Sequence, residues 1–165
     1  MRVAPVGAYF ADDLLRCVQE AAHSADPTHG HPEARAGAIA IAVGAALMAN
    51  SELEGDGFLD AVLARTPVSS VRLGIEKARA LQGLEVREAG ELLGNGSGVL
   101  CEDTVPFCLW VAARFNHDFK NAMWATVSVL GDRDTTCAIV GGMVVMRTGE
   151  VAIPRDWLER VEPFG

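Results

Sequence analysis

The sequence has 165 residues, of which 50% are hydrophobic and 22% are charged, and its formal net charge is −8. This length suits one domain, and the hydrophobic share is enough for a sizeable core. The acidic charge disfavours proteins that hold nucleic acid or an anionic membrane through phosphates. We therefore expect a single domain over residues 1–165 that binds neither nucleic acid nor membranes.

The cysteines and the N-terminal segment both indicate a cytoplasmic protein. The four cysteines are Cys17, Cys101, Cys108 and Cys137. They are far apart and form no C-x-x-C pair, so we expect reduced thiols, two of them in the core. The first residues include Pro5 and Gly7 and reach acidic residues too early for a signal peptide. The longest apolar run, residues 36–49, is shorter than the roughly 18 to 20 residues that span a bilayer.

Helical periodicity begins early in the chain. Residues 11–24 have apolar side chains at helical spacing, with Asp12 or Asp13 near the start, which predicts an amphipathic helix. Residues 26–32 break this pattern with two prolines and a glycine, and they contain two histidines. Residues 33–50 are apolar on nearly every side, which is typical of a buried central helix.

The remaining segments predict further helices and no strand. The expected helices cover residues 56–65, 70–81, 86–93, 103–115, 118–129 and 153–160, besides one that runs to Met146. Asp103 and Asp118 are the expected N-caps of two of them. The glycine-rich residues 94–98 are interpreted as a plain connector. No run shows the alternation of a half-buried strand, so the sequence predicts an all-α fold of about eight helices.

A group of polar residues follows Leu130 and Gly131. Asp132, Asp134 and Thr135 stand at the mouth of the last long helix, where their oxygens can be aimed at one point. Carboxylates and hydroxyls are the ligands that Mg²⁺, Ca²⁺ and Mn²⁺ select. The alternative is that an aspartate only caps the helix. Gly141 and Gly142 lie within this apolar helix, where each costs about 1 kcal/mol relative to alanine and therefore needs a packing reason. We take this requirement to favour the metal hypothesis over simple capping.

Four segments together resemble the C-terminal half of the ADP-ribosylglycohydrolases. They are residues 1–7 (MRVAPVG), 27–34 (PTHGHPEA), 102–110 (EDTVPFCLW) and 131–142 (GDRDTTCAIVGG). The resemblance covers nearly the whole chain. It implies an all-α, orthogonal multi-helix bundle with a binuclear Mg²⁺ site. It also implies hydrolysis of the glycosidic bond between ADP-ribose and a protein side chain or small molecule.

The resemblance also assigns roles to individual residues. It implies that Asp132, Asp134 and Thr135 are metal ligands and that His29 contacts ADP-ribose. Leu130 stands where the family pattern usually has a glycine. The family's remaining metal ligands and an acidic residue often assigned to catalysis belong to an N-terminal half. We therefore expect the chain to need that half, or a second copy of itself, as a partner.

Two functional hypotheses remain at this point. The first is an enzyme, a Mg²⁺-dependent hydrolase of ADP-ribosyl bonds. The second is a non-catalytic helical module that keeps the same fold for binding or structure.

Overall fold

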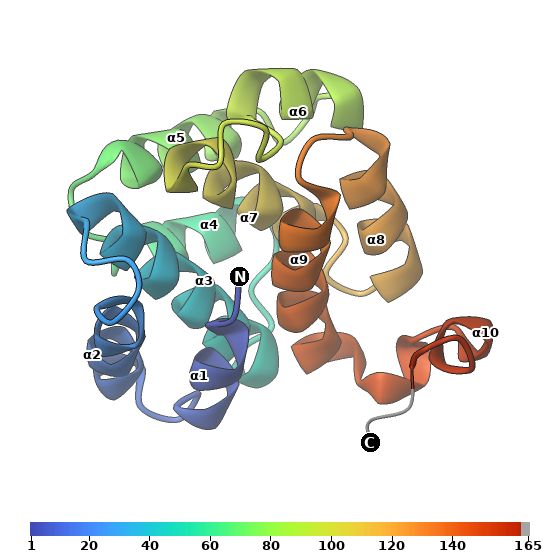
Figure 1. Cartoon of the computed structure of the whole chain (residues 1–165), viewed down its shortest axis with the longest axis horizontal. Helices are drawn as coiled ribbons and strands as arrows, with labels where there is room; N and C mark the ends of the chain where they lie inside the picture. Colours follow the sequence, from blue (N-terminus) through green and yellow to red (C-terminus); the bar gives the residue numbers. More distant parts are fainter. Residues whose placement is uncertain (163–165) are drawn as a thin grey trace.

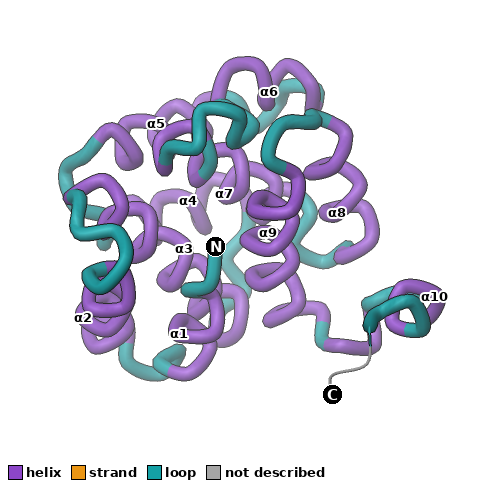
Figure 2. Tube along the Cα trace, in the orientation of Figure 1, coloured by secondary structure: helices purple, strands orange, loops and turns teal. Residues whose placement is uncertain are grey.

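The structure is a computed structural model that describes residues 1–162. These residues form ten α-helices and two short 3₁₀ helices, and no strand occurs among them (Figures 1 and 2). The elements are α1 (Ala4–Tyr9), α2 (Leu14–Ala25), α3 (Pro32–Asn50), α4 (Gly55–Leu63), α5 (Ser70–Ala80), α6 (Val86–Leu93), η1 (Cys101–Asp103), α7 (Val105–Arg114), α8 (Phe119–Ser128), α9 (Arg133–Thr148), η2 (Glu150–Ala152) and α10 (Arg155–Leu158). The predicted all-α fold is confirmed.

Helix α3 is the centre of the domain, with α1, α2 and α9 packed against it (Figure 1). Small residues let these neighbours come close. A Cβ added at Gly7 of α1 would overlap the carbonyl oxygen of Ala42, and one at Gly44 would lie 3.0 Å from the sulfur of Met143. By length and composition alone α3 could also cross a bilayer, yet 67% of the apolar window is buried inside the domain. That burial is what a core helix shows.

A second group of helices, α4, α5 and α7, covers the other side of the core. Residues 105–113 of α7 are all buried, because this helix is enclosed by α4, α5 and α9. Its Trp110 is fully buried, and the indole Nε1 donates to the carbonyl oxygen of Leu81 at 2.9 Å. This bond satisfies the one polar atom of the largest core side chain.

The structure differs from the predicted elements at two places. Helix α1 was not predicted, because Pro5 and Gly7 look like helix breakers. Pro5 lies in the first turn, where a missing N–H costs nothing, and Gly7 is needed for the contact with α3. The predicted N-cap Asp103 is wrong: Asp103 lies in η1, and its carboxylate accepts from the backbone N–H of Gly98 at 2.6 Å.

Glu33 joins the start of α3 to the start of α5. Its carboxylate accepts from the backbone N–H groups of Ser70 and Val71, at 2.9 and 3.0 Å. Burial raises the pKa of Glu33, but hydrogen bonds from Ser70 and Val71 and the nearby His31 together outweigh it, so the net pKa lies below the usual 4.5. The charged carboxylate therefore stabilises the first turn of α5.

Replacing Glu33 with Gln should lower the free energy of unfolding by about 1 kcal/mol at pH 7. Because the folded pKa is lowered, the contribution of Glu33 is present above pH 4.5 and is lost as the pH falls below it. The difference between wild type and Glu33→Gln should therefore shrink in acid. Chemical denaturation from pH 3 to 7 measures it, with Glu91→Gln on the exposed face of α6 as the matched control. Equal losses for both variants would contradict this role.

Candidate functional site

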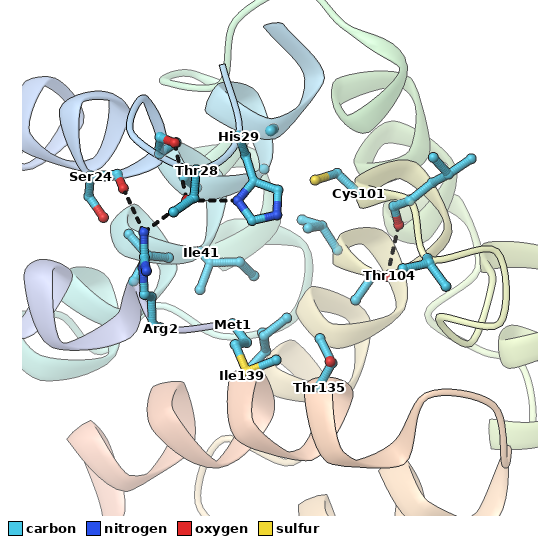
Figure 3. Close-up of a pocket in the computed structure, with 18 of the residues that line it drawn as sticks. Met1, Arg2, Ser24, Thr28, His29, Ile41, Cys101, Thr104, Thr135 and Ile139 are labelled. Atoms are coloured by element: carbon cyan, nitrogen blue, oxygen red, sulfur yellow. Dashed lines mark hydrogen bonds between the residues drawn. The ribbon is translucent and has the colours of Figure 1, made fainter. Parts of the chain in front are cut away.

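A cavity of about 500 Å³ opens between the N-terminal segment, the α2–α3 turn and the beginning of α9 (Figure 3). Its walls come from five segments: residues 1–3, 24–29, 34–41, 99–105 and 132–139. Its size is that of a small-molecule site. Most of the wall is apolar, with Ile41 and Ile139 among the lining residues, and polar groups occur at two ends.

The first polar end is built by Arg2, Thr28 and His29. The Arg2 guanidinium donates to the Thr28 hydroxyl at 2.9 Å and to the carbonyl oxygen of Ser24 at 3.3 Å. The same hydroxyl is 2.8 Å from His29 Nδ1. The His29 ring therefore has one nitrogen held by the turn, while the ring projects into the space between Arg2 and Cys101 (Figure 3). This end combines a fixed positive charge with an imidazole, which suits an anionic ligand.

The second polar end is the start of α9, where Asp132 and Thr135 line the cavity. Asp132 is the N-cap, and its Oδ1 accepts from the backbone N–H of Thr135 at 3.2 Å. The pKa of Asp132 is lowered first by hydrogen bonding from Thr135, through its side chain and its backbone N–H. Asp132 therefore caps the helix and also presents a charged carboxylate to the cavity.

The three predicted metal ligands are close together but do not all line the cavity. Asp134 is exposed and lies beside Asp132, outside the cavity wall. Among residues 1–162, no three His, Cys, Asp or Glu side chains gather closely enough to hold an ion. By donor chemistry, two carboxylates and one hydroxyl fit a hard cation such as Mg²⁺. They offer at most one side of an octahedral shell, and water or other groups must complete it.

The glycine-rich segment of residues 94–98 is not a plain connector, and that prediction was wrong. Asn95 and Gly96 pack directly against Asp132, and the backbone N–H of Asp132 donates to the carbonyl oxygen of Asn95 at 3.1 Å. Sequence reasoning also missed Arg2, which lies 26 residues from its partner Thr28. The sequence did contain a signal for the close packing of residues 94–98, since an asparagine between two glycines is typical of a tight, close-packed loop.

Leu130 has a left-handed backbone with φ of +62°, a conformation that favours glycine. Its side chain is 61% exposed, so burial offsets little of the strain. The fold thus keeps the glycine-type turn although a leucine occupies it.

Replacing Leu130 with Gly should raise the free energy of unfolding by about 0.5–1 kcal/mol, because a left-handed leucine costs more than the added freedom of glycine. Leu92→Gly is the matched control: Leu92 is partly exposed but lies within helix α6. There the change should destabilise the protein by about 1 kcal/mol or more. Urea denaturation distinguishes the two, and a loss of stability in both would contradict strain at Leu130.

Comparison with known proteins identifies the family of the chain. The model of the ADP-ribosylglycohydrolase family matches residues 1–164. An uncharacterized protein of Archaeoglobus fulgidus is 32% identical over 162 residues, which are 96% of this chain and 51% of that protein. The chain thus spans about half the length of this relative. No solved structure gives a significant match. Because the family model covers nearly every residue, the chain belongs to the ADP-ribosylglycohydrolase family.

Proposed function

We propose that this chain takes part in Mg²⁺-dependent hydrolysis of the glycosidic bond between ADP-ribose and an acceptor, either a protein side chain or a small molecule. One observation carries the proposal: Asp132 and Thr135 of α9 line the same cavity as His29, about a hundred positions earlier in the chain. Family membership supports a substrate that contains ADP-ribose.

Each end of the cavity has a part in this proposal. Arg2 and His29 would hold the diphosphate, because a guanidinium and a ring N–H both donate to phosphate oxygens. Asp132 and Thr135, together with Asp134 just outside the cavity wall, would hold Mg²⁺ through their oxygens. When bound, the metal would supply positive charge that orients the ribose hydroxyls and polarises water. The apolar wall between the two ends would exclude other water from the reacting bond.

Because the chain spans about half of its relative, the activity of a whole protein is part of the proposal. Among the described residues that line the cavity, Asp132 is the one acidic side chain and so the one candidate there for the acidic residue expected to act in catalysis. A second segment, supplied by a longer protein or by another copy, is the proposed source of the missing ligands. We also propose a cytoplasmic location, in keeping with four free cysteines.

A non-catalytic binding module is the second candidate function. The observation that favours it is the absence, within residues 1–162, of a cluster of three acidic, His or Cys side chains around one point. Such a module would bind ADP-ribose with little dependence on Mg²⁺ and would release no product. Turnover with and without metal separates the two candidates.

Replacing Asp134 with Ala should reduce hydrolysis of an ADP-ribosylated protein by at least a hundredfold, because a metal ligand is lost. The assay uses the chain with its longer native context, with added Mg²⁺ and with EDTA, which should abolish turnover. Asp156→Ala, an exposed aspartate of α10, is the matched control and should keep full activity. Full turnover in EDTA would exclude the metal mechanism.

Replacing His29 with Ala should weaken ADP-ribose binding by about tenfold, equivalent to one hydrogen bond to a charged group. Calorimetric titration with ADP-ribose measures the change. His23→Ala is the control, because His23 lies on the exposed face of α2, with its side chain 72% exposed, and does not line the cavity. Equal affinities for wild type and His29→Ala would remove His29 from the site.

A further inference from the structure

The turn that carries Asp132 is held from outside its own helix. Two hydrogen bonds from one residue cross to it: the backbone N–H of Asp132 donates to the carbonyl oxygen of Asn95 at 3.1 Å, and Asn95 Nδ2 donates to the carbonyl oxygen of Val129 at 3.0 Å. These bonds bracket Leu130 and Gly131 on both sides. Asn95 thus bonds to both the C-cap of α8 and the N-cap of α9.

The contact between the two loops leaves little room for adjustment. A Cβ added at Gly131 would overlap the backbone and side chain of Asn95, and one at Gly96 would lie 2.8 Å from the Cβ of Asp132. Both glycines also have positive φ, of +68° and +85°. Only glycine permits this approach, so the loop and the turn have a defined relative position.

Asn95 is itself held in place. Its Oδ1 accepts from the backbone N–H of Ser97 at 3.1 Å, and the loop is anchored to η1 by Asp103. The carbonyl oxygen of Asp103 accepts from Gly96 at 2.9 Å, and its carboxylate accepts from Gly98 at 2.6 Å. The side chain of Asn95 therefore connects an anchored loop to the 129–132 turn.

The turn needs such support because its backbone is strained. Leu130 and Gly131 both have positive φ, and for leucine this costs about 1–2 kcal/mol. An exposed leucine gains little from burial in return. Without the bonds to Asn95, the turn can relax, and the direction of the Asp132 carboxylate relaxes with it.

We propose that Asn95 is a positioning residue that holds the 129–132 turn and thereby aims the Asp132 carboxylate into the cavity. Asn95 does not line the cavity, so it acts through Asp132 and touches no ligand. The inference rests on the proposed function for the metal-binding part alone; the support of the turn is independent of it. Outer groups that orient a metal ligand typically change metal affinity by 10- to 100-fold.

The test compares Asn95→Ala with Ser97→Ala. Ser97 lies in the same loop, is exposed, and its hydroxyl makes no hydrogen bond within the described part of the chain. Amide hydrogen exchange followed by NMR reads the turn without any metal. We expect exchange at the Asp132 and Thr135 amides to become at least tenfold faster in Asn95→Ala, while Ile139 in the middle of α9 stays within twofold. Ser97→Ala should match wild type at all three amides.

Calorimetric titration with Mg²⁺ alone supplies the second reading, with an expected affinity loss of about tenfold or more in Asn95→Ala. Unchanged exchange at Asp132 would overturn the proposal, as would equal acceleration along all of α9, which would indicate a general loss of stability. The Mg²⁺ titration uses the chain in its longer native context, as in the hydrolysis assay. If wild type binds no Mg²⁺ there but the local exchange effect appears, the support by Asn95 stands and the proposed metal function fails.

Discussion

The close packing of small residues along α3 is the constraint on which the rest of the structure depends. Because glycines and alanines cover so much of this helix, α1 and α9 both approach its backbone closely. The approach of α1 brings Arg2 to the α2–α3 turn, and the approach of α9 places Asp132 across from His29. A larger side chain at Gly7 or Gly44 would separate these elements, and the cavity would lose one of its walls.

Most of the fold could be predicted from the sequence because its determinants are local. The apolar periodicity of α2, the all-apolar α3 and the cap at Asp118 each depend on residues within a few positions of one another. The same reasoning missed α1. Its Pro5 and Gly7 have low helix propensity, and the packing of α1 against α3 is a long-range contact that the local sequence does not encode.

The site was predictable only in part, for a related reason. His29, Asp132 and Thr135 were found through short motifs, and the structure brings them to one cavity. Arg2 and Asn95 act through partners 26 and 34 positions away, and no periodicity or cap encodes such a contact. The glycines beside Asn95 show that something packs there, but they do not show what.

Asp132 shows why the capping and metal hypotheses were hard to separate: the carboxylate caps α9, and in the proposed function the same group would also bind the metal. As N-cap it receives hydrogen bonds from Thr135, which lower its pKa and keep it charged. A charged, oriented carboxylate is also what a hard cation requires. Capping alone requires neither a cavity beside Asp132 nor contact between its turn and the 94–98 loop. Strain at Leu130 in a turn held by Asn95 is a cost that capping does not explain, because unstrained turns cap helices equally well. The strained turn is therefore better understood as the means by which the fold directs Asp132 toward the cavity.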